Sequence, residues 1–186
     1  MKQNLVLDLD NTLISAEALT EFPFEDEGVR EKATNFSIHD MDGYYIIFER
    51  PYLQKFLDWA FENFNVSIFT AASQSYCLFV VENIILKNSS RDLHYIFFSD
   101  HCKISRAIYN KASKNLQMLW ETFNLSEFDP TNTVIIDDYD EVYETQPDNC
   151  IHIKEFNILD EGSEHDTVLI DTIKPLLEEF IETGNL

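Results

Sequence analysis

The fold is decided by the stretch Leu5-Val6-Leu7-Asp8-Leu9-Asp10-Asn11-Thr12-Leu13-Ile14. It begins as a short apolar run, which is typical of a buried strand in a parallel sheet, and then places polar residues at alternate positions. Residues i and i+2 of a strand point the same way, about 6.6 Å apart, so we expect Asp8 and Asp10 to emerge together. They would do so at the C-terminal end of the strand, where open α/β sheets bind their ligands.

The closeness of Asp8 and Asp10 has a chemical consequence. Two such carboxylates repel unless a cation lies between them or one of them carries a proton. A divalent metal can hold a phosphate against one carboxylate, and the other can keep a proton for a leaving group. The alternative is an ordinary solvated Asp-x-Asp in a very acidic chain, and the pair alone does not decide between the two.

Composition narrows the class of protein. The chain has 186 residues, of which 45% are hydrophobic, and this favours one ordered domain with a sizeable core. Its net charge of -21, with 34 acidic against 13 basic residues, argues against a nucleic-acid surface and against adhesion to anionic membranes. Three cysteines without a Cys-x-x-Cys pair indicate reduced thiols. No apolar run reaches membrane-spanning length and no cationic signal peptide precedes Leu5, so we expect an intracellular protein of the nucleus or cytoplasm.

Strands and helices are predicted to alternate after the first strand, which implies a parallel sheet with helices on both faces. Residues 15–32 are expected to be irregular with one short helix, 36–49 to form a hairpin around Asp40-Met41-Asp42-Gly43, and 100–110 to form a loop. The further strands are expected at 66–69, 94–98, 133–136 and 150–153. The helices are expected from Pro51 to Phe64, at 74–87, from Lys111 or Lys114 to Phe123, and from about 166 to 183 with a kink at Pro175.

Polar residues follow two of these further strands. Thr70 comes directly after the second strand, and Asp137 and Asp138 follow 133–136. Parallel strands present their C-terminal ends on one edge, so these residues could converge with Asp8 and Asp10. A helix N-terminus after Thr70 would bind an anion, although a plain helix cap is the favoured interpretation of Thr70 taken alone.

These motifs resemble those of the haloacid dehalogenase (HAD) superfamily of phosphatases. The Asp-x-Asp-x-Thr motif is matched by Asp8, Asp10 and Thr12, the second motif by Thr70, and the acidic pair by Asp137-Asp138. Within the superfamily the chain looks like the FCP/SCP-type, NLI-interacting-factor-like protein phosphatases. The supporting stretches are Glu49-Arg50-Pro51, Phe69-Thr70-Ala71 followed by Tyr76, Tyr109-Asn110-Lys111, and Gln146-Pro147-Asp148-Asn149.

The resemblance implies a HAD-like Rossmannoid three-layer sandwich over residues 1–186, with a small hairpin inserted at about 33–49 after the first strand. It also implies the site. Asp8 would be the nucleophile that forms an aspartyl-phosphate, and Asp10 the general acid and base. Thr70 and Lys111, chosen over Lys114, would bind the transferring phosphoryl group, and Thr12, Ala71 and Tyr76 would contact substrate. Mg²⁺ would be held by Asp8, the Asp10 carbonyl and Asp138, with Asp137 beside them.

The chain departs from the family pattern at two places, of which the first concerns the substrate and the second alters only a loop. Ser99 stands where the phosphatases of the RNA polymerase II tail carry an arginine that contacts the peptide, whereas the aromatic residue is kept as Tyr76. Tyr139-Asp140 replaces the usual Ser-Pro after the acidic pair. The resemblance therefore implies a phosphoserine or phosphothreonine protein as substrate, with one peptide-reading residue missing.

Two alternatives stay open at this point. A phosphatase of the same chemistry could act on a small metabolite, which a large helical cap over the site would favour. The segment 15–49 is too short for such a cap. A binding module without activity could also keep the fold, which the loss of Asp8 or Asp10 would favour, and neither is lost.

Overall fold

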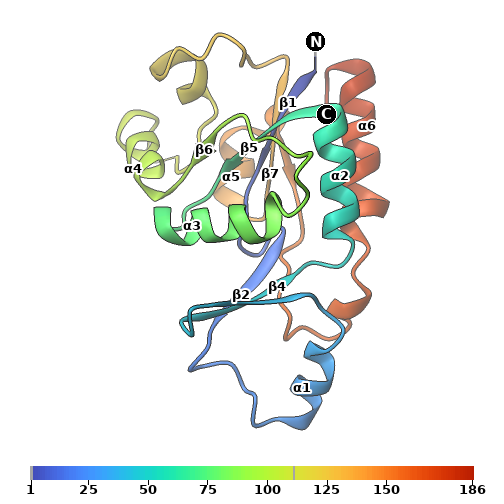
Figure 1. The fold of residues 1–186 in the computed structure, drawn as a ribbon. Coiled ribbons are helices and arrows are strands. Elements are labelled where there is room, and N and C mark those ends of the chain that lie inside the picture. The colour runs from blue at the N-terminus through green and yellow to red at the C-terminus, as the bar shows by residue number, and fades with distance from the viewer. Residues whose placement is uncertain (1, 111) are drawn as a thin grey trace.

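The computed structural model describes residues 2–110 and 112–186. Its centre is a five-stranded sheet in the order β6-β5-β1-β7-β8, in which all neighbours are parallel. The strands are β1 (Gln3–Leu7), β5 (Phe64–Phe69), β6 (Ile96–Phe97), β7 (Thr133–Asp137) and β8 (Cys150–His152). β1 is the middle strand, between β5 and β7, so residues that follow these three strands meet at one edge (Figure 1).

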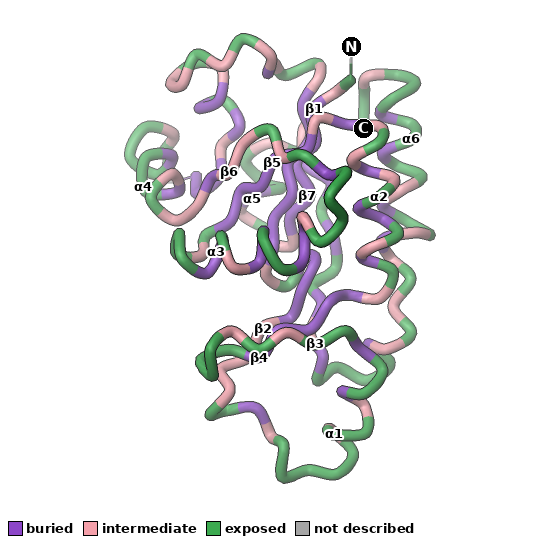
Figure 2. Tube along the Cα trace, in the orientation of Figure 1, coloured by how far each residue is buried: buried purple, intermediate pink, exposed green. Residues whose placement is uncertain are grey.

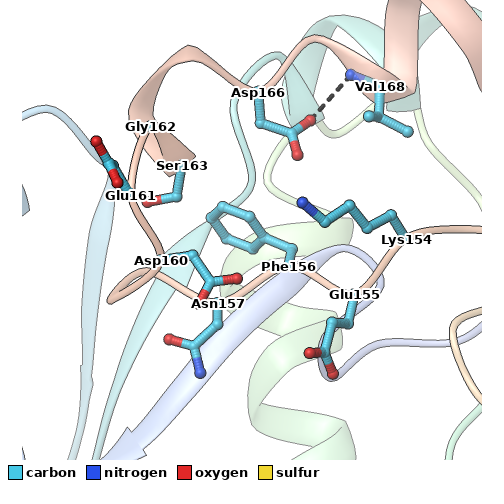
Figure 3. A pocket seen from close by; sticks show the side chains of 10 residues that line it. All are labelled: Lys154, Glu155, Phe156, Asn157, Asp160, Glu161, Gly162, Ser163, Asp166 and Val168. Carbon is cyan, nitrogen blue, oxygen red and sulfur yellow. Dashed lines mark hydrogen bonds between the residues drawn. The ribbon is translucent and has the colours of Figure 1, made fainter.

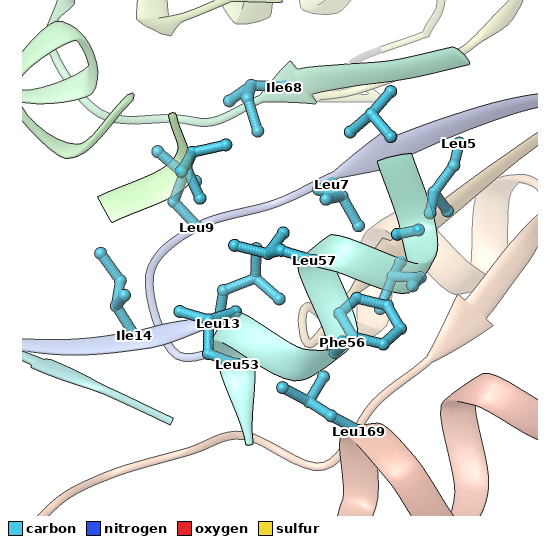
Figure 4. Close-up of a cluster of buried hydrophobic side chains, with 14 of the residues drawn as sticks. Leu5, Leu7, Leu9, Leu13, Ile14, Leu53, Phe56, Leu57, Ile68 and Leu169 are labelled. Carbon is cyan, nitrogen blue, oxygen red and sulfur yellow. The ribbon is translucent and has the colours of Figure 1, made fainter. Parts of the chain in front are cut away.

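Alternate residues of β1 separate the two faces of this sheet. Leu5 and Leu7 belong to a core with α2 (Leu53–Asn63), α3 (Gln74–Val80) and α6 (Lys174–Thr183). Figure 4 shows Leu5 and Leu7 facing Phe56 and Leu57 of α2. Val6 points the other way, into a second core with α4 (Ser99–Ile108) and α5 (Asp140–Thr145). This arrangement confirms the predicted three layers, and the strands are the most buried part of the chain (Figure 2).

A small antiparallel sheet follows β1, in the order β2-β4-β3. Its strands are β2 (Ile14–Ala18), β3 (Ile38–Met41) and β4 (Tyr45–Glu49), so the predicted hairpin is confirmed. The turn uses left-handed backbone at Asp42 (φ 50°) and Gly43 (φ 76°). β2 was not predicted, because its sequence Ile-Ser-Ala-Glu-Ala has too few β-prone residues; it is ordered by pairing with β4. The short helix α1 (Glu27–Ala33) lies next to this sheet (Figure 1).

The prediction of a loop at 100–110 is wrong, because Ser99–Ile108 forms α4. This helix buries only Cys102 and Ser105, so no large apolar side chains mark its buried face in the sequence. The helix expected from Lys111 or Lys114 is shorter in the structure. Its regular part is a π-helical turn at Met118–Thr122, and Lys114 lies in the loop before it.

The last predicted helix loses its regular α-helical geometry just before Pro175, where the sequence predicts a kink. A π-helical turn at Leu169–Ile173 leads into α6, whose second residue is Pro175. Proline has no N–H to continue the regular hydrogen-bond ladder, which explains the irregular turn at this place. A π-helical turn at Val81–Ile85 also extends α3, within the helix predicted at 74–87. None of the helices in the described part of the chain has the length and apolar character that a membrane span requires.

Candidate active site

A cleft of about 290 Å³ lies at the C-terminal edge of the central sheet. Asp8 follows β1, Thr70 follows β5, and Asp138 follows the last residue of β7, Asp137. The predicted convergence of these residues is what the structure shows. The described residues that line the cleft are Asp8, Asp10, Asn11, Thr70, Ala71, Arg106, Ser113, Lys114, Asp137, Asp138 and Tyr139.

Thr12 holds the carboxylates of Asp8 and Asp138 in place through its hydroxyl. Its hydroxyl lies 3.0 Å from Oδ2 of Asp8 and 3.2 Å from Oδ1 of Asp138. The chain reaches this position through a left-handed residue, Asn11 (φ 59°), which directs the Thr12 side chain inward. Thr12 is fully buried and does not line the cleft. Its contacts are therefore with the carboxylates, on the side away from the open cleft.

Lys114 supplies the positive charge inside the site. Its ammonium lies 2.5 Å from Oδ1 of Asp8 and 2.7 Å from Oδ2 of Asp137, and all three side chains are almost completely buried. Burial by itself would lower the pKa of Lys114, but the carboxylates of Asp8 and Asp137 outweigh it and raise that pKa. The ammonium is thus held in its charged form.

The loop that carries Lys114 is fixed by side chains from distant elements. Gln146 accepts a hydrogen bond from the N–H of Leu116 (2.9 Å) and donates one to the carbonyl of Lys114 (2.8 Å). Glu141 of α5 accepts from the hydroxyl of Ser113 (2.6 Å). These bonds tie the lysine loop to the segment that follows β7, so the position of Lys114 depends on the α5 region.

The sequence analysis preferred Lys111 to Lys114 for the phosphoryl-binding lysine. Lys111 lies outside the described residues. The structure brings Lys114 into the cleft, where it contacts two of the predicted acidic residues. The loop before the π-helical turn at Met118–Thr122 is what carries it there.

Asp10 is held by an aromatic residue. The hydroxyl of Tyr76 donates a hydrogen bond of 2.5 Å to Oδ1 of Asp10. Burial raises the pKa of Asp10 to about 6, and the bond from Tyr76 opposes part of that rise. Tyr76 itself is buried and meets the ring of Tyr45 edge-on at 5.6 Å. The predicted contact of Tyr76 with substrate stays a prediction, since its observed partners are Asp10 and Tyr45.

The carboxylates of Asp8, Asp137 and Asp138 are suited to a divalent cation. Each offers one oxygen, and these three oxygens lie within 4.8 Å of one another. Carboxylate oxygens are the ligands that Mg²⁺ prefers. Asp137 is already occupied, because its oxygens accept from Lys114 and from the N–H of Tyr139 (3.0 Å). Asp138 accepts a side-chain hydrogen bond from Thr12 on one oxygen only, so of the acidic pair it is the better placed ligand, and Asp137 contacts Lys114 instead.

Thr70 and Ala71 form the wall of the cleft after β5. The hydroxyl oxygen of Thr70 accepts a hydrogen bond from the N–H of Ala72 (3.1 Å), so its own proton stays available to a ligand. Ala71 is exposed at the cleft. α3 begins just beyond, with Ser73 as its N-cap. The cleft thus has a donor at the place where the sequence predicts one.

Arg106 is a cleft residue that the sequence analysis missed. It belongs to α4, in the segment that was expected to be a loop, and no local motif marks it. Ser99 begins the same helix, and its N–H donates to the carbonyl of Ala72 (2.9 Å). Ser99 is not among the residues that line the cleft.

A second hollow, of about 200 Å³, lies along the segment 154–168 and contains none of the predicted site residues (Figure 3). Arg50, which contacts lining residues of this hollow, is almost completely buried, pairs with Asp166 (2.8 Å) and donates to the carbonyl of Thr12 (2.9 Å). The ring of Phe156 lies 5.4 Å from its guanidinium. These contacts fix the loop after Asp10 through a residue that does not line the cleft.

Comparison with known proteins agrees with this geometry. The family model of the NLI interacting factor-like phosphatases matches residues 3–185. The chain is similar to the CTD phosphatase-like protein 355R of Invertebrate iridescent virus 6, with 47% identity over 90% of this chain and 93% of that protein. It is also similar to the CTD phosphatase-like protein 355R of Invertebrate iridescent virus 3, with 35% identity over 94% of this chain and 95% of that protein.

Among solved structures, the fold is similar to that of the fission yeast RNA polymerase II CTD phosphatase Fcp1 bound to beryllium fluoride. The TM-score is 0.60 at 22% identity, over 96% of this chain and 50% of that chain. The family match covers nearly the whole sequence, and the resemblance stated from the motifs is thereby confirmed. The chain belongs to the NLI interacting factor-like phosphatases of the HAD superfamily and is a phosphoric monoester hydrolase.

Proposed function

We propose that this phosphatase is Mg²⁺-dependent, works through an aspartyl-phosphate on Asp8, and removes phosphate from phosphoserine or phosphothreonine in a protein, such as an RNA polymerase II tail-like substrate. The observation that carries the proposal is the arrangement around Asp8. One carboxylate oxygen is held by Lys114 and the other by Thr12, and Asp10 lines the same cleft. A carboxylate fixed at both oxygens is pre-oriented for attack on phosphorus.

In the first half-reaction, an oxygen of Asp8 forms a bond to phosphorus while the bond to the seryl or threonyl oxygen breaks. Asp10 delivers a proton to the departing oxygen. A pKa raised to about 6 by burial suits this role, because the carboxyl can both hold and release a proton near neutral pH. The products of this step are the free hydroxyl side chain and phosphorylated Asp8.

In the second half-reaction, water attacks the phosphorus of the aspartyl-phosphate. Asp10, now ionised, takes a proton from that water, and the bond between phosphorus and Asp8 breaks. Inorganic phosphate leaves, and Asp8 returns as a carboxylate. One residue thus serves as acid and then as base, which requires that its position does not change between the steps. The hydrogen bond from Tyr76 provides that constraint.

The transferring phosphoryl group carries negative charge that the cleft must offset. Lys114 and the hydroxyl of Thr70 are the donors placed to do this, and we assign Lys114 the role that was predicted for Lys111. The residues Asp8 and Asp138, with the carbonyl of Asp10, would hold Mg²⁺. When bound, the ion would bind a phosphate oxygen and reduce the repulsion between the phosphate and Asp8.

The surroundings of the cleft favour a protein substrate. All its described lining residues come from positions 8–11, 70–71, 106–114 and 137–139, and none from the inserted segment 14–49. The small sheet therefore does not enclose the cleft as a cap around a metabolite would. An open cleft can accept a side chain that projects from a large partner.

The experiment is hydrolysis of p-nitrophenyl phosphate and of phosphoserine and phosphothreonine peptides, with and without Mg²⁺, by the wild type and by Asp8→Asn. We expect turnover of both substrate classes only in the wild type and only with Mg²⁺. A panel of phosphorylated sugars and nucleotides serves as the comparison. Higher kcat/KM on that panel than on every phosphopeptide contradicts the protein substrate, whereas wild-type rates in Asp8→Asn contradict the mechanism.

A further inference from the structure

We infer that Arg106 is a phosphate-binding residue of this cleft, which admits the phosphate dianion of the substrate and holds it against Asp8. This inference rests on the proposed function. Arg106 lines the cleft from the last turns of α4. It is exposed, and it forms neither a hydrogen bond nor an ion pair with any residue that the structure describes. Its guanidinium can therefore turn toward a ligand without breaking an existing contact.

The charges in the cleft explain why a second cation is needed. Four carboxylates, those of Asp8, Asp10, Asp137 and Asp138, line the cleft together with the ammonium of Lys114. That ammonium already lies at contact distance from two of them. Even with Mg²⁺ bound, the charges of the ion and of Lys114 do not exceed those of the four carboxylates, so an incoming phosphate dianion meets no net positive charge, in a chain whose total charge is -21.

Arg106 is the cation that remains. Among the described residues that line the cleft, Arg106 and Lys114 are the basic ones. Of these two, only Lys114 forms ion pairs with carboxylates. Guanidinium binds phosphate oxygens through two parallel N–H donors, so it can hold a phosphate in one orientation. Lys114 would then stabilise the phosphoryl group beside Asp8 while it balances the buried carboxylates, and the exposed Arg106 would bind the same phosphate as it enters.

The position of Arg106 on α4 relates it to Ser99. The two residues are seven positions apart, about two helical turns, so they share one face of the helix. The amide of Ser99 is bonded to Ala72, beside the wall formed by Thr70 and Ala71. The helix face that carries Ser99 at its start therefore presents a cation to the cleft near its end. The positive charge of Arg106 on this helix face thus takes the place of the charge that the uncharged Ser99 does not supply.

The test compares Arg106→Gln with a matched variant, Lys103→Gln. Lys103 lies on the same helix, is exposed, and pairs with Asp100 (2.7 Å) outside the cleft. Both variants remove one positive charge from α4. Binding of inorganic phosphate to the Mg²⁺-loaded protein is measured by calorimetry, and KM and kcat are measured on p-nitrophenyl phosphate.

We expect Arg106→Gln to weaken phosphate binding by about ten-fold, the loss that corresponds to one hydrogen bond from a charged donor. KM should rise more than kcat falls. Arg106→Lys should restore part of the affinity, because it keeps the charge but loses the paired donors. Lys103→Gln should bind phosphate much as the wild type does.

Two results would overturn the inference. Equal weakening in Arg106→Gln and Lys103→Gln would mean that only the overall charge of α4 matters. Unchanged phosphate affinity in Arg106→Gln would mean that the guanidinium does not reach the anion. The calorimetry needs no turnover, so it separates this inference from the proposed function, whose own failure would appear as wild-type rates in Asp8→Asn.

Discussion

The hydroxyl of Tyr76 and the carboxylate of Asp10 are joined by a hydrogen bond of 2.5 Å, although 66 positions separate the two residues in the chain. Tyr76 lies on α3, and its ring is fixed by the edge of Tyr45 from the small sheet. Burial raises the pKa of Tyr76, so the phenol stays a donor. The small sheet and α3 together thus hold the side chain that we assign as the general acid and base.

The first prediction concerns this contact. Tyr76→Phe keeps the ring but removes the donor, so Asp10 can turn away from the leaving oxygen. We expect kcat to fall by about ten-fold, the order of one hydrogen bond to a charged group, with a smaller change in KM for p-nitrophenyl phosphate. Tyr45→Phe is the control, because it keeps the edge-on contact with Tyr76 and loses a hydroxyl that bonds to no described residue. A similar loss of kcat in both variants contradicts the assignment.

The second prediction concerns Lys114. Lys114→Met leaves Asp8 and Asp137 buried without a counter-charge, and breaking a buried pair in this way costs about 3 kcal/mol or more. We expect the free energy of unfolding, measured with urea at neutral pH without Mg²⁺, to fall by about that amount, and activity to be lost as well.

Lys111→Met is the comparison for the same pair of measurements. It tests the role that the sequence analysis gave to Lys111. We expect Lys114→Met to lose more activity and more stability than Lys111→Met. The reverse order of activity loss would return the phosphoryl-binding role to Lys111.

The third prediction concerns the metal ligands. Mg²⁺ should raise the melting temperature of the wild type, because an ion that binds the folded state stabilises it. Asp138→Asn should abolish most of this rise, since Asp138 offers an oxygen to the ion site and the amide is a weaker ligand. Asp137→Asn should keep more of it, because the oxygens of Asp137 are bound by Lys114 and the N–H of Tyr139. Equal Mg²⁺ responses in the two variants would place the ion elsewhere.

The strand ends of the site could be predicted from the sequence because they depend on local patterns. Short apolar runs ended by Asp8, Thr70 and Asp137 indicate buried parallel strands, and parallel strands bring their ends to one edge. This part of the site needed no knowledge of contacts between distant residues.

The positions of Lys114 and Arg106 in the cleft could not be predicted from local sequence patterns. Lys114 reaches the cleft because Gln146 and Glu141, some 30 residues away, fix the loop around it. Nothing between Tyr109 and Asn115 encodes those bonds, and the motif at Tyr109-Asn110-Lys111 favours the other lysine. Arg106 was missed because α4 buries only the small residues Cys102 and Ser105, so no large apolar side chains mark it as a helix in the sequence.

The central claim is that Asp8 carries the phosphoryl group during turnover. The most direct measurement mixes the enzyme with a radiolabelled phosphate monoester, quenches with acid within a turnover, and maps the label on the protein. The account predicts label on the peptide that contains Asp8, released by hydroxylamine as expected of an acyl phosphate, and no label in Asp8→Asn. Label of equal amount in Asp8→Asn would contradict it, and so would turnover of the radiolabelled ester by the wild type without any labelled Asp8 peptide.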